Sequence, residues 1–478
     1  MTKPKFYWYN NSLLIINPTK SIEDFLVYYK KSLEVIPGKF ERKSSLKKQL
    51  LFNVVHPGPE NRTIQTLQGF KNKLVAIAAK DGEFEFHDHR LKSPEPRYNL
   101  MYGFRFGQEG LLRQALMKNQ SGLIQAPTRY GKTYLIANTL RAFPGVQAVV
   151  AAPGVDLLGQ TVNQLQELLC EREVKGIFTG SRNRNPSSDI TVCSLDSLTK
   201  LDIEGTKLLL IDEPHAAVSE SRAPVLARFK NARIYGFGAT LKGRYDGADK
   251  LITGIMGPIL SKITFREAVK EEAICDIKVF MVKVPFEHFP AAKRDTAYNR
   301  LVYKNQNFFS IIQEVSKTII PEEWQTLIFI DQKKQADLMA KFVTSSEVAI
   351  AGRMTKAGRK EMFEAMQANE IKRCICTDIY AQGVTFPDLR VLVNAAGGGG
   401  HIASTQKPGR LAQVRPGKAR GYLVDFLFEC VDGEDEHGQT VHSAWNHVVR
   451  DCAARMKQYK TLGYDVQVVD SITEITLE

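Results

Sequence analysis

The hydrophobic pattern of the first hundred residues differs from that of the rest of the chain. Short apolar runs at 13–16, 50–55 and 74–79 are separated by turn residues such as Pro57 and Gly58. Runs of this length between proline and glycine are typical of short strands, helices and tight turns. The pattern predicts a small α+β domain over residues 1–98.

From residue 122 onward, short buried strands alternate with helical stretches. This rhythm predicts a mostly parallel sheet with helices on both faces, over residues 99–265. The expected strands lie at 123–125, 148–152, 190–193, 208–211 and 234–236. The expected helices lie at 111–118, 133–141 and 157–171.

A second rhythm of the same kind starts near residue 277 and predicts a second α/β lobe over 275–430. Its expected strands lie at 279–284, 326–330, 347–350, 374–377, 391–394 and 421–425, with helices at 332–343 and 356–368. A hinge is expected around 262–278. Residues 431–478 are predicted to form a helical tail. The predicted fold class is therefore α/β, with two tandem doubly wound lobes.

The charge balance of the chain bears on the kind of partner that it binds. The chain has 65 Lys and Arg against 52 Asp and Glu, a net charge of +13. Residues 1–100 hold 17 of these bases against 10 of the acids, so over half of the excess lies there. Such an excess favours a polyanionic partner, although a solvated surface explains a single cluster equally well. We expect residues 1–98 to be a basic substrate-binding domain, in which the aromatic residues at 6–9 are either core or base-stacking.

The cysteines and the N-terminus bear on the cellular compartment. Seven scattered cysteines do not indicate a disulfide framework, and Cys374 and Cys376 are expected to be core residues of a strand. The apolar run at 13–16 is far too short for a signal sequence or a membrane span. A reduced, cytoplasmic protein without a membrane partner is expected.

The segment 126–133, APTRYGKT, predicts a phosphate-binding loop, because it follows an expected strand and precedes a helix. Such a loop needs backbone N–H groups at a helix N-terminus, a lysine for the β- and γ-phosphates and a hydroxyl for Mg²⁺. Lys132 and Thr133 provide these groups, and Gly131 permits close approach of the backbone. The ligand expected from this pattern is ATP with Mg²⁺.

Two acids follow the apolar run at 208–211, in the sequence DEPH. Asp212 is suited to hold Mg²⁺, directly or through water, and Glu213 is suited to deprotonate the attacking water. An acid at the end of a strand is often only a helix cap. The pairing with the loop at 126–133 favours the catalytic interpretation.

These residues resemble motifs of superfamily 2 helicases. The segment around Lys132 and Thr133 is similar to motif I, the DEPH at 212–215 to a motif II of the DExH form, and the GAT at 238–240 to motif III. The segment 104–108 resembles the one whose glutamine, here Gln108, reads adenine. The stretches 149–160 and 191–198 resemble motif Ia and a strand and turn that contact the nucleic-acid backbone.

The second lobe carries further resemblances. Residues 376–385 are similar to motif V and residues 405–410 to motif VI, in which an arginine reaches the γ-phosphate. Arg410 is the arginine-finger candidate. The family usually has a second arginine where this chain has Gln413, and Arg415 lies two residues later. The glycines at 397–400 are interpreted as a flexible turn, since no lysine-bearing helix follows them.

The resemblance implies two RecA-like lobes, ATP hydrolysis and the following functional residues. The expected catalytic residues are Lys132, Asp212, Glu213 and Arg410; the nucleotide-binding residues are Gln108, Thr128, Gly131, Lys132, Thr133, Gly383, Arg410 and Arg415; the Mg²⁺ ligands are Thr133 and Asp212.

The arrangement of domains looks most like that of phage helicases that remodel branched DNA. This resemblance implies a DNA helicase of replication, recombination or repair that drives branch migration at forks and Holliday junctions, in a bacterial or phage-infected cytosol. Two alternatives stay open. One is an RNA helicase of the DExH kind, because these motifs grip the phosphate backbone. The other is a duplex translocase, such as the motor of a restriction complex, although no nuclease signature accompanies the motor.

Overall fold

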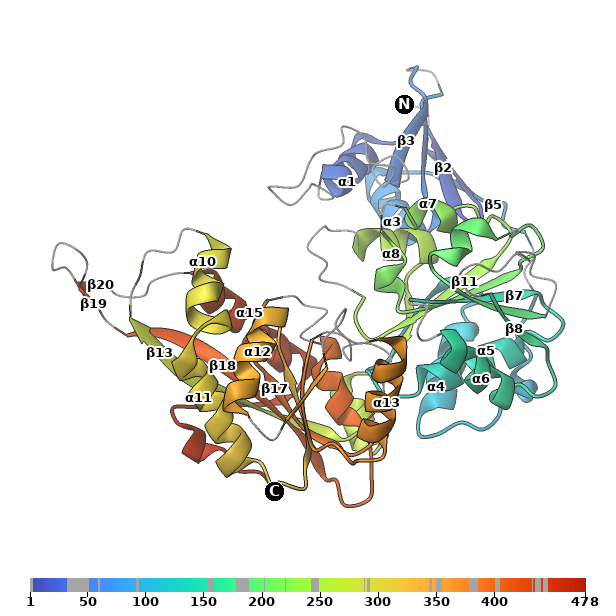
Figure 1. Cartoon of the computed structure of the whole chain (residues 1–478). Helices are drawn as coiled ribbons and strands as arrows, with labels where there is room; N and C mark the ends of the chain where they lie inside the picture. Colours follow the sequence, from blue (N-terminus) through green and yellow to red (C-terminus); the bar gives the residue numbers. More distant parts are fainter. Residues whose placement is uncertain are drawn as a thin grey trace. The chain divides into compact units, whose positions relative to one another are not determined.

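The computed structural model (Figure 1) describes most of the chain. The described residues are 3–31, 51–58, 61–91, 94–153, 158–177, 189–201, 203–219, 221–241, 249–287, 289, 293–343, 346–349, 355–377, 386–399, 405–431, 433–434, 440–441 and 446–478. They group into two compact units. Unit 1 comprises Met1–Pro127 and Gly131–Ile263, and unit 2 comprises Thr128–Tyr130 and Thr264–Glu478. The boundary at Ile263 lies inside the segment 262–278, where the sequence predicts a hinge.

Unit 1 begins with a small five-stranded sheet. Its strands are β1 (Lys5–Trp8), β2 (Ser12–Ile16), β3 (Phe52–His56), β4 (Thr63–Leu67) and β5 (Glu85–Asp88), in the order β3-β4-β2-β1-β5. All neighbours are antiparallel except β1 and β5. Helices α1 (Lys20–Lys31) and α3 (Lys71–Asp81) accompany it. The predicted α+β domain is confirmed.

Side-chain alternation along β1 determines which aromatic residues of the run at 6–9 are buried. Phe6 and Trp8 are buried in the hydrophobic core, whereas Tyr9 is 37% exposed. Successive side chains of a strand point to opposite faces, so one aromatic pair must enter the core while the other leaves it. Half of the run is therefore core.

The N-terminal sheet shares its core with the rest of unit 1. A single hydrophobic cluster runs from Phe6 through Phe70 to Met256. The turn η1 (Gln68–Phe70) packs on α8 (Asp249–Met256) so closely that a Cβ on Gly69 would overlap the carbonyl oxygen of Thr253. The side chain of Gln68 donates a hydrogen bond to the Ile255 carbonyl at 3.0 Å. The basic domain is thus a fixed part of unit 1.

The second sheet of unit 1 is parallel throughout. Its order is β12-β6-β11-β10-β7-β9-β8. Its strands are β6 (Gly122–Gln125), β7 (Ala148–Ala152), β8 (Val174–Ile177), β9 (Ile190–Ser194), β10 (Leu208–Asp212), β11 (Arg233–Gly238) and β12 (Ile259–Lys262). The helices and turns are η2 (Tyr98–Leu100), α4 (Gln108–Leu116), α5 (Lys132–Ala142), α6 (Leu158–Leu168), η3 (Ser197–Lys200), η4 (Pro214–Ala216) and α7 (Ala223–Leu226), followed by α8.

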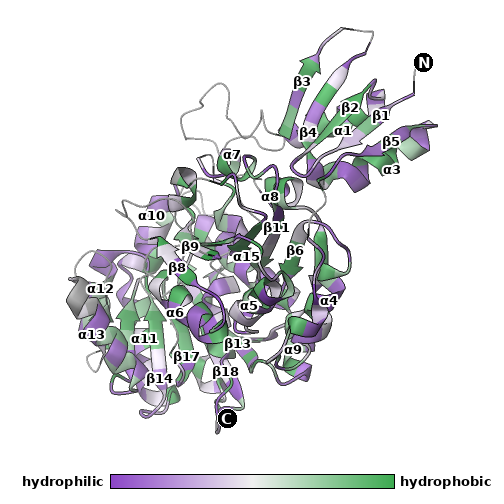
Figure 2. Ribbon diagram, turned by 90° about the vertical axis from the view of Figure 1, so that its right-hand side faces the viewer, coloured by the Kyte–Doolittle hydropathy of each residue, from purple (hydrophilic) through white to green (hydrophobic). Residues whose placement is uncertain are grey.

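The hydrophobic character of this sheet follows from its topology. Every residue of β7, β9 and β11 is buried, and Figure 2 shows the hydrophobic colour along part of β6. Parallel strands are covered on both faces, so they lack polar alternation. This explains why five of these strands could be predicted as continuous apolar runs.

Unit 2 contains a second parallel sheet, in the order β15-β16-β14-β17-β18-β13-β21. Its strands are β13 (Asp276–Glu287), β14 (Gln325–Phe329), β15 (Glu347–Ala349), β16 (Arg373–Cys376), β17 (Leu389–Asn394), β18 (Arg420–Val431) and β21 (Asp465–Val469), and β19 (Gly433–Glu434) pairs separately with β20 (Thr440–Val441). The helices and turns are α9 (Phe265–Lys270), α10 (Arg294–Tyr298), η5 (Asn299–Tyr303), α11 (Gln306–Glu314), η6 (Val315–Ile319), α12 (Lys333–Phe342), α13 (Lys356–Gln367), η8 (Pro408–Ala412), α15 (His447–Leu462) and η9 (Ile472–Glu474). Two tandem RecA-like lobes are confirmed.

The C-terminal segment is more than a helical tail. Asn446 caps α15 by accepting hydrogen bonds from the amides of Val448 and Val449, and Gly463 ends the helix with a φ of +87°. After this turn β21 pairs with β13 at the edge of the sheet. The segment therefore completes unit 2. None of the helices in the described ranges is long and apolar enough to cross a membrane.

Candidate nucleotide-binding site

The predicted phosphate loop joins β6 to α5, as its sequence indicates. Gly131 adopts a φ of +93°, and a Cβ added there would lie 2.5 Å from Nε2 of Gln108. Both the left-handed backbone and the lack of space demand glycine at this position. Lys132 and Thr133 follow in the first turn of α5, where backbone N–H groups are not used by the helix. This is the local geometry that binds anions.

Gln108 lies beside this loop, although the sequence separates them. It is the first residue of α4 and is only 1% exposed. Its Oε1 accepts a hydrogen bond from the backbone amide of Arg105 at 3.0 Å, which orients the side-chain amide. The predicted adenine-reading residue and the predicted phosphate loop are thus adjacent.

The acids of the DEPH segment reach the same place through the sheet order. Strands β6 and β10 both flank β11 in parallel, so their carboxyl ends share one edge. There Nζ of Lys132 lies 3.2 Å from Oε1 of Glu213, with both side chains largely buried. Nδ1 of His215 lies 3.3 Å from Oε2 of the same carboxylate. Lysine and glutamate, far apart in the sequence, form an ion pair.

The two carboxyl groups experience opposite electrostatic environments. Burial and the neighbouring Glu213 charge raise the pKa of Asp212 above the usual range for a carboxyl group. Burial also disfavours the charged form of Glu213, but Lys132 and His215 outweigh this effect and lower its pKa. Glu213 also has a φ of +52°, which is unusual for a residue with a side chain. Opposite shifts and local strain in one cluster are typical of a functional site.

Asp212 provides the structural test for a metal ion. Its Oδ1 is buried and has no hydrogen-bond partner among the described residues. A buried carboxylate oxygen without a donor is costly, and a divalent cation would satisfy it. Thr133 offers a hydroxyl from the first turn of α5. These residues fit Mg²⁺, which takes one or two protein oxygens beside phosphate oxygens.

The GAT segment at 238–240 is held against the same edge. The amide of Ala126 donates a hydrogen bond to the Gly238 carbonyl at 3.2 Å, and Gln125 Nε2 donates one to the Ala239 carbonyl at 3.0 Å. A Cβ at Gly238 would lie 2.8 Å from Cδ of Pro214. The predicted motif III is therefore locked between the phosphate loop and the DEPH segment.

The two candidate arginines of unit 2 have different environments. Arg410 lies in η8 and is 5% exposed, and burial lowers its pKa to about 9. Arg415 lies beyond the end of that helix and is exposed, with its Nε 3.9 Å from Oδ1 of Asp388. Because η8 ends at Ala412, Arg415 does not continue its helical face.

Several sequence predictions, in both lobes and in the N-terminal domain, fall on residues that the structure does not describe. Gly383 and all of 378–385 lie outside the described residues, as do 154–157 of the predicted motif Ia and the basic clusters within 39–48. Cys374 and Cys376 are both fully buried in β16, as predicted for core residues.

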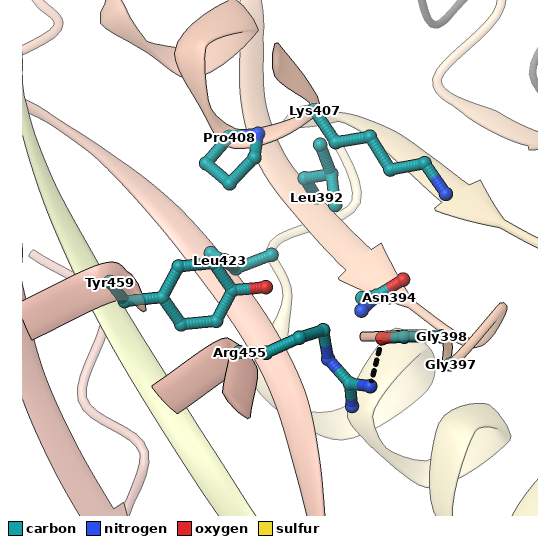
Figure 3. Close-up of a pocket in the computed structure, with 9 residues that line it drawn as sticks. All are labelled: Leu392, Asn394, Gly397, Gly398, Lys407, Pro408, Leu423, Arg455 and Tyr459. Carbon is teal, nitrogen blue, oxygen red and sulfur yellow. Dashed lines mark hydrogen bonds between the residues drawn. The ribbon is translucent and has the colours of Figure 1, made fainter. Parts of the chain in front are cut away.

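A buried polar network lines a pocket next to Pro408, the first residue of η8. Figure 3 shows a pocket in unit 2 lined by Asn394, Gly397, Gly398, Lys407, Pro408, Arg455 and Tyr459, among others. Arg455 donates two hydrogen bonds to the Asp425 carboxylate, each 2.8 Å long, and a third to the Gly398 carbonyl at 2.6 Å. The Tyr459 hydroxyl donates to Asp425 at 2.7 Å. The network joins α15 and β18 to the glycine turn.

Sequence reasoning missed this network. Arg455 and Tyr459 are four residues apart on α15, which places them on one helix face, and Asp425 interrupts the apolar run of β18. That spacing was the available signal, but only the fold reveals that these segments meet. Gly397 and Gly398 have φ values of +68° and +77°, so the glycine turn is a defined conformation. The flexibility of this turn, which the sequence suggested, stays a prediction.

Comparison with known proteins agrees with this geometry. Residues 101–243 match the family described as type III restriction enzyme, res subunit, and residues 310–414 match the helicase conserved C-terminal domain. Each match falls on one of the two parallel-sheet lobes. The chain belongs to the superfamily 2 helicases and is an ATP-hydrolysing enzyme of that class.

Individual relatives are distant. The chain is 22% identical to helicase 22 of Sulfolobus islandicus filamentous virus, with 88% of this chain and 79% of that protein covered. It is 23% identical to the DNA 3'-5' translocase XPB2 of Sulfurisphaera tokodaii, with 64% and 78% covered. The fold is similar to that of Saccharomyces cerevisiae Dbp5 bound to RNA and ADP BeF3, with a TM-score of 0.52, 17% identity and 77% and 89% covered.

Proposed function

We propose that the chain is an ATP-driven DNA helicase or translocase that unwinds or branch-migrates forked and Holliday-type DNA. The observation that carries the motor function is the ion pair between Lys132 and Glu213 at 3.2 Å, which joins the phosphate loop to the candidate base. DNA as the substrate is supported by the translocase relative and by the basic N-terminal domain. Replication, recombination or repair would be the setting.

Each site residue has a proposed task. Thr128, Gly131 and Lys132 bind the phosphates, and Gln108 holds the adenine. Thr133 and Asp212 would hold Mg²⁺, which supplies neutralisation of the phosphate oxygens when it is bound. Glu213 accepts a proton from the water that attacks the γ-phosphorus, and the bond to the ADP oxygen breaks.

The observed ion pair suggests how ATP prepares the base. Lys132 is held by Glu213 at 3.2 Å, so its ammonium group is already engaged. A γ-phosphate competes for the same ammonium group and would withdraw it from the carboxylate. The freed Glu213 then has an oxygen available for water, which ties activation of the base to nucleotide binding.

Unit 2 contributes the remaining charges in this proposal. Arg410 acts as the arginine finger on the γ-phosphate when the lobes close, which links hydrolysis to movement. Its burial supports this choice, because a desolvated guanidinium interacts strongly with phosphate. Arg415 has a lesser role, and Gly383 contacts the nucleotide.

The compartment proposed is the cytosol of a bacterium or of a phage-infected cell. All seven cysteines are free thiols, and five of them are buried. This usage is usual where thiols stay reduced.

Two other functions remain as candidates. The first is an RNA helicase, because the helicase motifs grip the phosphate backbone and do not distinguish RNA from DNA. The likeness to Dbp5 concerns the fold alone. The match of residues 101–243 to a restriction-enzyme subunit favours, as a second alternative, a translocase that moves on duplex without separating it.

A strand-displacement assay separates the three. The full chain is incubated with ATP and Mg²⁺ on forked DNA, a mobile Holliday junction, forked RNA and plain duplex, with Lys132→Ala as the inactive control. Displacement of forked DNA and resolution of the junction support the proposal. Activity confined to RNA, or nucleic-acid-stimulated ATP hydrolysis on duplex without displacement, would replace it by the corresponding alternative.

A further inference from the structure

A cluster of lysines and tyrosines lies where the N-terminal domain meets α8. Nζ of Lys73, on α3, lies 2.9 Å from the Tyr29 hydroxyl and 5.3 Å from the centre of that ring. Nζ of Lys250, on α8, also lies 5.3 Å from the Tyr29 ring centre, and 5.9 Å from that of Tyr28. Two ammonium groups from separate helices thus face one ring. We call Tyr28, Tyr29, Lys73 and Lys250 the basic–aromatic patch.

No carboxylate among the described residues is paired with the lysines of the basic–aromatic patch. Within the described part of the chain, neither Lys73 nor Lys250 forms an ion pair with an acid. Lys20, on the same helix as the tyrosines, is instead paired with Asp24 at 3.0 Å. Like charges that gather around a ring repel one another. A bound anion would relieve that repulsion.

One of the two rings of the patch, that of Tyr28, is open to solvent, whereas Tyr29 is partly buried against the core. Tyr28 is 67% exposed, among the most exposed large hydrophobic side chains described, and Lys31 lies one helical turn further along α1. An exposed ring beside several ammonium groups suits a ligand that has both flat apolar faces and a chain of negative charges. A nucleic-acid strand with unpaired bases has both.

We propose that the basic–aromatic patch binds single-stranded nucleic acid, with Lys73 and Lys250 at phosphates and Tyr28 stacked on an unpaired base. The inference rests on the proposed function and assigns part of its substrate grip to residues outside the helicase motifs. An acidic peptide would also attract the two lysines. It would not use the face of Tyr28, because carboxylate side chains have no ring to stack.

The patch is mechanically joined to the nucleotide site. Lys250 belongs to α8, and a Cβ on Gly254 of that helix would lie 2.7 Å from Cδ1 of Leu67 in the N-terminal sheet. Met256, at the other end of α8, has its sulfur 3.1 Å from the position of a Cβ on Gly236 of β11. Such close packing transmits displacement rather than absorbing it. A strand held at the patch would therefore move together with the lobe that carries Lys132.

The first test is the salt dependence of binding. A fluorescent oligothymidylate is titrated with the full chain at several salt concentrations, for the wild type and for Lys73→Ala/Lys250→Ala. Each phosphate contact that is lost lowers the slope of log K against log salt by about 0.7 on single strands, so we expect a decrease of about 1.4. Lys73→Arg/Lys250→Arg should keep most of the slope, and Lys20→Ala is the matched exposed control.

The second test isolates stacking. Tyr28→Ala should weaken binding of the oligothymidylate by at least about five-fold, while Tyr28→Phe keeps the ring and the affinity. Binding to blunt duplex should depend much less on Tyr28, because paired bases are not available to stack. Thermal unfolding of each variant is measured alongside, and the high exposure of Tyr28 predicts no change in its midpoint.

Several results would overturn the inference. Unchanged slopes in Lys73→Ala/Lys250→Ala, or equal affinity of Tyr28→Ala and Tyr28→Phe, would remove the strand-binding role. Competition by polyglutamate that depends on both lysines, without any effect of Tyr28, would assign the patch to acidic proteins. In either case ATP hydrolysis stimulated by DNA in the wild type would leave the proposed function intact. Absence of stimulation by any nucleic acid would count against the proposed function itself.

Discussion

Replacement of Glu213 by glutamine separates the role of Glu213 as the proposed base from its role as the partner of Lys132. Glu213→Gln keeps the size of the side chain and removes its charge. Turnover should decrease at least ~100-fold, because the amide cannot accept the proton of the attacking water. ATP should nevertheless bind more tightly, because Lys132 loses its ion pair with Glu213 within the protein.

The expected gain in affinity can be estimated from the geometry. Lys132 and Glu213 are 3.2 Å apart, with side chains that are 13% and 18% exposed, so solvent screens their attraction only in part. A hydrogen bond to a charged group contributes about 1 kcal/mol more than a neutral one. Since 1.4 kcal/mol corresponds to a factor of ten, ATP should bind about five-fold more tightly.

The assay combines equilibrium titration with a fluorescent ATP analogue and single-turnover hydrolysis in the presence of DNA. Glu109→Gln is the matched control, since Glu109 pairs with Arg113 at 2.7 Å on the exposed face of α4. It should change neither quantity. Hydrolysis by Glu213→Gln close to the wild-type rate would refute the assignment of the base. Unchanged or weaker ATP binding would refute the competition for Lys132.

Three further predictions concern other parts of the molecule. Arg410→Ala should lower DNA-stimulated hydrolysis by ~10³-fold or more with little change in nucleotide affinity, and Arg415→Ala should lower it far less. A steady-state ATPase assay compares the two variants. A larger loss of activity in Arg415→Ala than in Arg410→Ala would show that motif VI is misaligned. Gly69→Val should destabilise unit 1 by ~1–3 kcal/mol in urea unfolding, because its side chain would overlap the Thr253 carbonyl. Gly110→Ala, which lies in open space on α4, should not destabilise it. Equal unfolding midpoints of the two variants would mean that the packing of η1 on α8 opens easily. Arg455→Met should cost ~3–5 kcal/mol at neutral pH by leaving the buried Asp425 carboxylate unpaired. Burial alone would raise the pKa of Asp425, but Arg455 and its other partners lower it, so this stabilisation should be present at neutral pH and disappear as the pH falls through the folded-state pKa; a wild-type unfolding free energy that rises on acidification would contradict it.

The sequence by itself determined the local parts of the site. Residues 148–152 were predicted as a strand and coincide with β7, and the phosphate loop lies between β6 and α5 as expected. These features depend on neighbours in the chain: an apolar run, a glycine with a left-handed backbone and the N-terminus of a helix. Local chemistry of that kind can be read without knowledge of the fold.

The strands that were missed share a position in the fold. β8, β12 and β21 are all edge strands of their sheets. An edge strand has a neighbour on one side only and is less completely covered, so its sequence need not be a continuous apolar run. The burial patterns of β12 and β21 include exposed residues, unlike that of β7. Pattern alone therefore identified the central strands of both parallel sheets and overlooked three of their four edge strands; the fourth, β15, was predicted at 347–350.

Tertiary structure alone decided which distant residues meet. The contact of Lys132 with Glu213 depends on both β6 and β10 lying next to β11, and strand order is not encoded in any one segment. The same holds for Arg455 with Asp425, and for the packing of Gly69 on α8, which makes the basic domain a fixed part of unit 1. Each of these contacts exists because many weak apolar interactions select one arrangement of the elements. The sequence therefore determined the chemistry of the chain, and the packing determined which of its charges face each other.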